Sequence, residues 1–310
     1  MTDHTVDEHA GGGVGEHAER FTHLRPLLFT IAYEILGSAT ESDDVLQDSY
    51  LRWAEVDLAT VRDTKSYLAQ LVTRQALNAL RAGARRREEY IGPWLPEPLL
   101  LDDRDASSDV VLAESVSMAM LVVLETLGPD ERAVFVLREV FGFDYDEIAG
   151  AVGKSAAAVR QVAHRARAHV QARRKRFEPD AAKSAQVTEQ FLTAAATGDM
   201  DGLLTLLAPN VTWTADSDGK ASAARRPVVG AEKVARVLLG IMNAGLKLPD
   251  VRFETAVYNS APAVVIYSGE KLEGVFLVEI TDGQVTHLYA MRNPDKLTGV
   301  LVAREIRRTV

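Results

Sequence analysis

Apolar residues in the first ninety or so positions recur every three or four residues in three successive segments. This spacing places apolar side chains on one face of a helix. The expected helices run from Ala18 to a stop at Gly37, from a cap at Ser42, and from Thr64 to about Arg87. The pattern predicts an all-α helical unit at residues 18–90, preceded by a flexible N-terminus at residues 1–17.

A proline-rich segment interrupts this helical pattern. Residues 91–109 contain Pro93, Pro96 and Pro98, followed by acidic residues and serines. Proline lacks the backbone N–H that a helix interior needs, so this segment is expected to be a linker. A second all-α unit is predicted at residues 110–177. Its expected helices are Val110–Leu127, ending at Gly128-Pro129, then Asp130–Phe141, Tyr145–Val152 and Ser155–Arg176.

The pattern changes again near residue 185, where strand-like alternation follows two helices. Asp282-Gly283 separates the last two strands and is a strong hairpin turn signal. The expected helices are Val187–Thr197 and Met200–Leu207, and the expected strands are Val211–Thr214, Phe253–Tyr258, Ala263–Ser268, Gly274–Ile280 and Val285–Met291. The sequence predicts an α+β domain at residues 186–310, with a curved antiparallel sheet and helices on one side.

Composition and charge narrow the function. A chain of 310 residues fits two or three domains, and the absence of cysteine excludes disulfides and thiolate metal sites. Neither an apolar leader in Met1–Gly15 nor a long apolar run is found, so no membrane partner and a cytoplasmic location are expected. The net charge of −9 is segregated: basic clusters lie around residues 81–87 and 160–176, and acids lie elsewhere. Nucleic acids bind local basic patches, so a negative net charge does not exclude a nucleic-acid partner.

The most specific motif lies between Asp144 and Arg174. Gly153 falls in a tight turn between two short helices, which is typical of a helix-turn-helix, whose second helix enters the major groove. On that helix, Arg160, Gln161 and other long polar residues reach base edges or phosphates. The alternative is an ordinary helical hairpin with a basic, solvated face.

Two further segments each leave two interpretations open. The helix Ser66–Arg87 combines apolar and aromatic residues with Asn78 and Arg81, which suits a melted DNA strand, but an amphipathic core helix fits equally well. The segment Asp43–Trp53 has acids on one side and apolar residues on another. It is either a docking surface for a basic partner or an acidic, solvated face.

Together these segments resemble a known family. Ser42–Trp53, Ser66–Arg87 and Leu127–Arg174 are similar, in order and spacing, to regions two and four of the extracytoplasmic-function sigma factors. The resemblance covers about Phe21–Phe177. It is particularly close in Arg138-Glu139-Val140-Phe141-Gly142-Phe143, Glu147-Ile148-Ala149, Ser155 to Val159-Arg160-Gln161, and His164-Arg165-Ala166-Arg167.

Three motifs outside these regions resemble a SigJ-like subgroup, which fuses a SnoaL-like domain of the NTF2 superfamily to the sigma module. They are Trp94-Leu95-Pro96-Glu97-Pro98, Asp216-Ser217-Asp218-Gly219-Lys220 and Asn293-Pro294-Asp295-Lys296-Leu297. In the second motif, Ser217 and Asp218 stand where glycines are usual. The resemblance implies two all-α sigma modules followed by an α+β, cone-shaped domain that encloses a pocket.

The resemblance also assigns roles to residues. It implies that core RNA polymerase contacts Asp44, Gln47, Asp48 and Trp53. It implies that the melted minus-ten element contacts the loop around Val56–Asp63 and Asp63, Tyr67, Arg74, Asn78 and Arg81. It implies that the minus-thirty-five duplex contacts Ser155, Ala158, Arg160, Gln161, His164, Arg165 and Arg167. It implies regulatory interdomain contacts at Trp94, Leu95, Pro96, Asp216, Asp218, Gly219, Lys220, Asn293, Pro294, Asp295, Lys296 and Leu297.

The expected function is therefore promoter recognition with core RNA polymerase and promoter DNA as partners, no enzymatic activity, and no cofactor or metal. The C-terminal domain is expected to pack against both sigma modules and the linker, and a small ligand or protein partner at that domain is left open. One alternative is a small-molecule enzyme or ligand-binding protein of the NTF2 superfamily with a DNA-binding appendage. Its acid–base residues would come from Asp216, Asp218, His287 and Tyr289. Another is a transcriptional regulator that binds DNA without polymerase.

Overall fold

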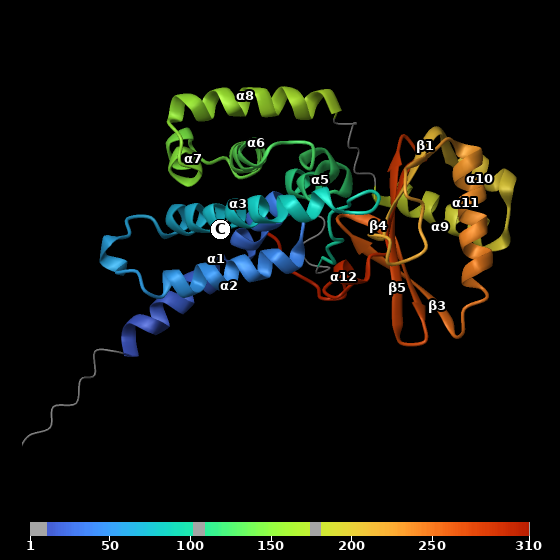
Figure 1. Ribbon diagram of the computed structural model, residues 1–310, viewed down its shortest axis with the longest axis horizontal. Helices are drawn as coiled ribbons and strands as arrows, with labels where there is room; N and C mark the ends of the chain where they lie inside the picture. Colours follow the sequence, from blue (N-terminus) through green and yellow to red (C-terminus); the bar gives the residue numbers. More distant parts are fainter. Residues whose placement is uncertain (1–10, 102–108, 174–180, 310) are drawn as a thin grey trace, which may run out of the picture.

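The computed structural model of the chain describes residues 11–101, 109–173 and 181–309 (Figure 1). Parts of the predicted N-terminus, linker and second basic cluster lie outside the described residues, as do the side chains of Arg85 and Arg86. Helices occupy one side of the molecule in Figure 1, and a sheet with its own helices occupies the other. In the described part of the chain, no helix is long and apolar enough to cross a membrane.

The first helical group consists of three long helices that pack on one another. They are α1 (Gly11–Leu36), α2 (Ala39–Trp53) and α3 (Thr64–Glu88), with a short 3-10 turn η1 (Leu58–Thr60) before α3. Gly37 ends α1 with a positive φ of 68°, as expected for a glycine stop. The three-helix unit predicted from apolar spacing is present, with two corrections at helix starts.

Contacts of the observed helices accompany both corrections. Helix α1 begins at Gly11, earlier than the predicted Ala18. His17 is buried in this earlier part, and its backbone oxygen accepts a hydrogen bond from Trp53 Nε1 at 2.9 Å. Ser38, not Ser42, caps α2, since Ser38 Oγ accepts a hydrogen bond from the amide of Glu41 at 3.0 Å. Ser42 lies inside the first turn, where it donates to the Ser38 carbonyl.

The second helical group comprises shorter helices. They are α4 (Val110–Ser115), α5 (Met118–Leu124), α6 (Pro129–Phe135), a π-helical turn η2 (Val136–Val140), α7 (Tyr145–Val152) and α8 (Ala156–Arg173). The single helix predicted at Val110–Leu127 is divided in two. Ser117 interrupts it, because its hydroxyl donates to the Glu114 carbonyl and accepts from the Met120 amide, thereby capping α5.

The C-terminal domain, from α9 to residue 309, is built on a six-stranded sheet. Its elements are α9 (Ala181–Thr197), α10 (Met200–Leu206), β1 (Leu207–Asp216), β2 (Val228–Val229), α11 (Ala231–Gly245), β3 (Val251–Tyr258), β4 (Ala261–Ser268), β5 (Lys271–Thr281), β6 (Gln284–Met291) and α12 (Pro294–Leu297). The strand order is β2-β1-β6-β5-β4-β3. The α+β architecture predicted from the sequence is confirmed.

The sheet differs from the prediction in two respects. Strand β1 pairs with β6 in parallel, with Thr212 opposite His287, so the sheet is mixed and not wholly antiparallel. The helix α11 and the short strand β2 were not predicted. Helix α11 contributes Val234 and Leu238 to the core on one sheet face, together with α9 and α10.

The opposite face of the sheet packs on the rest of the molecule. Tyr258, Leu277 and Tyr289 on this face share a hydrophobic cluster with Leu95 of the linker and Met118 of α5. The two helical groups likewise share one continuous hydrophobic cluster. After α12 the chain returns to the first helical group (Figure 1), where Ile306 is buried in that cluster.

A buried carboxyl group lies where the two helical groups meet. Glu34 of α1 has no exposed surface, and its Oε1 accepts a hydrogen bond from Ser115 Oγ of α4 at 2.7 Å. Burial raises the pKa of Glu34 to about 8, and the hydrogen bond from Ser115 only partly opposes this shift. In an unfolded chain the pKa of a glutamate is about 4.3. Between these values the folded chain holds a proton that the unfolded chain has lost, so this group's contribution to stability falls as pH rises.

We expect Glu34→Gln to remove this pH dependence. The free energy of unfolding of the variant, relative to the parent, should improve by up to about 1.4 kcal/mol per pH unit between roughly pH 5 and pH 8. Denaturant unfolding at a series of pH values measures this difference. Glu16→Gln, at an exposed position on the same helix, is the matched control. Parallel pH profiles for the parent and Glu34→Gln would contradict the assignment.

Candidate regulatory interface and nucleic-acid faces

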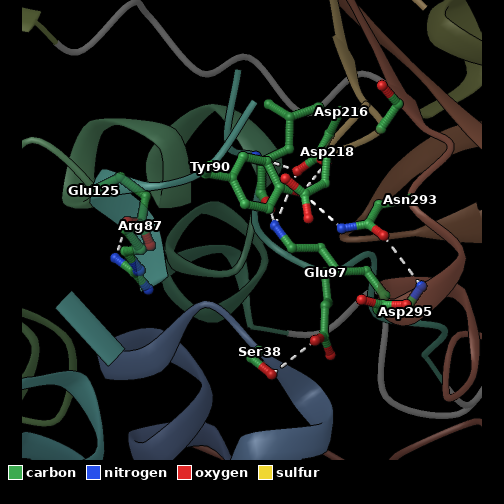
Figure 2. Close-up of polar contacts among 12 residues, drawn as sticks. Ser38, Arg87, Tyr90, Glu97, Glu125, Asp216, Asp218, Asn293 and Asp295 are labelled. Carbon is green, nitrogen blue, oxygen red and sulfur yellow. Dashed lines mark hydrogen bonds and ion pairs between the residues drawn. The ribbon is translucent and has the colours of Figure 1, made fainter. Parts of the chain in front are cut away.

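A buried ion pair joins two of the predicted regulatory motifs. Asp216, at the end of β1, has no exposed surface, and its Oδ2 lies 2.9 Å from Nζ of Lys296 in α12. The same oxygen accepts the Leu95 amide of the linker at 2.7 Å, and Oδ1 accepts the hydroxyl of Tyr90. Figure 2 shows Asp216 beside Tyr90. The carboxylate thus binds the linker to the C-terminal domain.

Aromatic residues of the linker complete the surroundings of Lys296. Its ammonium lies 3.3 Å from the centroid of the Trp94 ring and donates to the Leu95 carbonyl at 2.7 Å. Burial lowers the pKa of Lys296, and the nearby Asp216 carboxylate opposes that shift. Asn293 donates to the Tyr90 hydroxyl at 2.7 Å and caps α12 through the Asp295 amide. The linker motif and the Asn293–Leu297 motif are therefore in direct contact.

The Asp216–Lys220 motif reaches the linker through Asp218. Its carboxylate accepts the Ile91 amide at 3.1 Å, and Lys220 bridges Asp218 and Asp295 at 3.1 and 2.5 Å. Asp218 and Gly219 both have positive φ, 49° and 69°. This loop therefore contacts the linker, with aspartate in the left-handed conformation where the subgroup usually has glycine.

The linker also contacts the first helical group. Glu97 accepts hydrogen bonds from Ser38 Oγ at 2.8 Å and the Thr40 amide at 3.1 Å, so it contacts the start of α2 (Figure 2). Its backbone carbonyl accepts from the hydroxyl of Tyr33 at 2.7 Å. Pro96 lies against Gly37, where a side chain would collide with Glu125.

Asn259, in the turn between β3 and β4, was not predicted and contacts three parts of the molecule. Its Oδ1 accepts the Leu99 amide of the linker at 2.9 Å. Its Nδ2 donates to the Tyr33 hydroxyl of α1 at 2.7 Å and to the Val116 carbonyl after α4 at 2.8 Å. The Asn259 side chain is fully buried, and the backbone at this residue has a positive φ of 51°. The sequence signal for this residue is only that of a turn between two strands.

Two further sets of charged contacts join the helical groups to each other and to the segment that follows α12. Glu125, the C-cap of α5, pairs with Arg87 of α3 at 2.5 Å and with Arg132 of α6 at 2.8 Å. Arg304, after α12, pairs with Asp43 of α2 at 3.0 Å. The segment that follows α12 therefore lies on the first helical group.

The helix-turn-helix predicted at α7 and α8 is present, and its outer face is open. Gly153 ends α7 with a φ of 69°, and Ser155 Oγ accepts the Ala158 amide at the start of α8. Val159 and Val162 face the core. The predicted minus-thirty-five residues lie on the other side: Ser155, Arg160, Gln161, His164 and Arg165 are exposed, whereas Ala158 and Arg167 are half-buried.

The predicted minus-ten residues lie on α3, which packs against the second helical group. Arg74 donates to the Gly150 carbonyl at 2.5 Å, and Arg81 pairs with Asp130 at 2.7 Å. Ser66 of the same helix donates to Glu147. Asn78 and Tyr67 stay exposed, and Asp63 caps α3 by accepting the Ser66 amide. Helices α6 and α7 thus contact this face of α3 through Arg74 and Arg81, and all five predicted minus-ten residues keep exposed surface.

The acidic helix α2 gives a mixed result for the predicted polymerase-binding residues. Asp44, Gln47 and Asp48 are exposed. Trp53 is fully buried, because α1 covers it and its Nε1 donates to the His17 carbonyl. The prediction of a direct contact for Trp53 is therefore wrong in this arrangement.

The predicted acid–base residues do not form one site. Thr212 lies opposite His287 in the parallel pair, and four residues of strand, about 13 Å, separate Thr212 from Asp216. Asp216 is already engaged by Tyr90, Leu95 and Lys296. His287 and Tyr289 lie beside Glu279, a residue that was not predicted, with Tyr289 donating to it at 2.8 Å.

Comparison with known proteins agrees with this arrangement. Residues 20–86 match the family described as Sigma-70 region 2, and residues 117–170 match Sigma-70, region 4. The chain is 39% identical to the ECF RNA polymerase sigma factor SigJ of Mycobacterium tuberculosis, over 90% of this chain and 92% of that protein. It is 30% identical to a probable ECF sigma factor SigI of the same species, over 88% and 92% of the two chains.

A solved structure resembles the whole molecule. The crystal structure of Mycobacterium tuberculosis SigJ has a TM-score of 0.72 and 32% identity, covering 91% of this chain and 98% of that one. The two helical groups define the sigma factor class. The chain belongs to the extracytoplasmic-function RNA polymerase sigma factors.

Proposed function

We propose that the chain binds core RNA polymerase in the cytoplasm, directs it to promoter DNA, and is held in a closed arrangement by its C-terminal domain, which itself catalyses no reaction. The observation that carries the regulatory part is the Asn259 side chain. It binds α1, the linker and the end of α4 at once. A single side chain of the C-terminal domain therefore fixes the position of both helical groups.

The two proposed DNA-binding surfaces differ in the closed arrangement. The minus-thirty-five face of α8 is exposed, whereas Arg74 and Arg81 on the minus-ten face of α3 bind α6 and α7. A melted strand needs both the phosphate-neutralising side chains and room to lie along the helix. In the closed chain a melted strand would therefore compete with Gly150 and Asp130 for Arg74 and Arg81, whereas duplex DNA would meet no such competition at Arg160.

Docking on the polymerase does not require prior opening. Asp44, Gln47 and Asp48 form an exposed acidic surface on α2, and such a surface favours association with a basic partner. We propose that this surface binds the core enzyme first. Binding then favours the open arrangement, provided the core enzyme contacts it more strongly than the closed one. The domain boundaries at residues 18–90, 91–109, 110–177 and 186–310 stay part of this proposal.

Removing Arg160 tests the promoter contact. Arg160→Ala should weaken promoter binding by about 5- to 150-fold, because a base or phosphate contact typically contributes about 1–3 kcal/mol. Core binding should be unchanged. Fluorescence anisotropy with promoter DNA and with core polymerase measures both. Arg236→Ala, at an exposed position on α11, is the control. An equal loss of promoter and core binding would show that α8 is not the promoter-specific surface.

Removing the Asn259 side chain tests the closed arrangement. Asn259→Gly tolerates the positive φ and deletes three hydrogen bonds that only the closed form makes. The affinity for core polymerase and promoter-specific transcription should rise at least about tenfold, since even one lost buried hydrogen bond is worth roughly 1–1.5 kcal/mol. Asn243→Gly, exposed near the end of α11, is the matched control. Unchanged or weaker core binding by a folded Asn259→Gly protein would contradict the regulatory proposal.

A further inference from the structure

A cavity of about 1160 Å³ opens between the second helical group and the sheet. Met118 and Val122 of α5 form one wall, Leu192 of α9 forms another, and Thr214 and Tyr289 lie on the sheet. Ligand sites in proteins usually measure about 300–1,000 Å³, so this space is ample for a small molecule. Its walls come both from the C-terminal domain and from the second helical group, which carries the proposed promoter-binding helix α8.

A polar group lies on the sheet side of this largely apolar cavity. The strand register places Glu279 opposite His287, and Leu277 opposite Tyr289. The Tyr289 hydroxyl donates to Glu279 Oε2 at 2.8 Å, and His287 Nδ1 lies 3.6 Å from Oε1. Burial raises the pKa of Tyr289, which keeps its hydroxyl protonated as a donor. Glu279 is therefore held in place while its oxygens, each with two lone pairs, keep capacity to accept a further hydrogen bond.

The charges around the cavity select the kind of ligand. Among the described residues, three carboxylates line it, from Glu114, Glu189 and Glu279, against Arg173 at the end of α8. An anionic ligand would be repelled by this set, whereas a hydrogen-bond donor matches the Glu279 carboxylate. The apolar remainder of the wall favours a ligand with little other polarity.

We infer that this cavity binds a neutral, largely apolar small molecule that donates a hydrogen bond to Glu279, and that the ligand stabilises the closed arrangement. A ligand that contacts both α5 and the sheet loses part of its contacts when the two separate. It therefore binds the closed form more tightly and opposes opening. This coupling rests on the proposed function, whereas binding itself does not.

N-phenyl-1-naphthylamine is a suitable probe, because it is neutral, apolar and has one N–H donor, and its fluorescence increases in apolar surroundings. The full chain should bind it and should bind its sulfonated analogue, 8-anilino-1-naphthalenesulfonate, at least tenfold more weakly. Thr214→Phe should weaken probe binding at least several-fold by projecting a ring into the cavity from the sheet. Thr205→Phe, at an exposed position on α10, should not. Glu279→Gln should reduce the preference for the neutral probe, because it removes one charge without changing the shape.

Equal probe binding by the two phenylalanine variants, or an unchanged probe preference in Glu279→Gln, would overturn the site. N-phenyl-1-naphthylamine that just saturates the parent should weaken core polymerase binding by the parent several-fold and that by Thr214→Phe less. Probe binding with no effect on core affinity would overturn the coupling. If the parent failed to bind core polymerase at all, the proposed function would fail while the probe measurements would still decide the site.

Discussion

The buried charge pair of Asp216 and Lys296 constrains the rest of the molecule. A charged group without a partner is very costly in a protein interior, so neither residue is tolerated there without the other. Asp216 comes from β1 and Lys296 from α12, and the pair is completed by the Leu95 amide and the Trp94 ring of the linker. The linker supplies part of the surroundings of this pair and is thereby held against the C-terminal domain.

From this point the contacts extend to both helical groups. Leu95 is followed by Glu97, which binds the start of α2, and by Leu99, whose amide binds Asn259. Asn259 in turn binds Tyr33 and the Val116 carbonyl. A short run of linker thus joins the C-terminal domain to both helical groups. The linker acts as a structural part of the interface and not as a free tether.

Much of the fold could be predicted from the sequence, because helices with a wide apolar face have a clear spacing. Helix α3 and the turn at Gly153 are examples, and so are the motifs that meet at Asp216. Other features depend on contacts between distant segments. Trp53 has the same local pattern whether α1 covers it or not. The parallel pairing of β1 with β6 and the contacts of Asn259 follow from the tertiary arrangement, which no local pattern of residues encodes.

The distance between the two helical groups tests the closed arrangement most directly. The chain has no cysteine, so Glu19→Cys on α1 and Gln171→Cys on α8, both exposed positions, allow two specific labels. Pulsed electron–electron spin resonance on the full chain should give one narrow distance, which changes when core polymerase is added. A broad distribution in the free chain, or the same distance with and without core polymerase, would contradict the closed arrangement as the resting state.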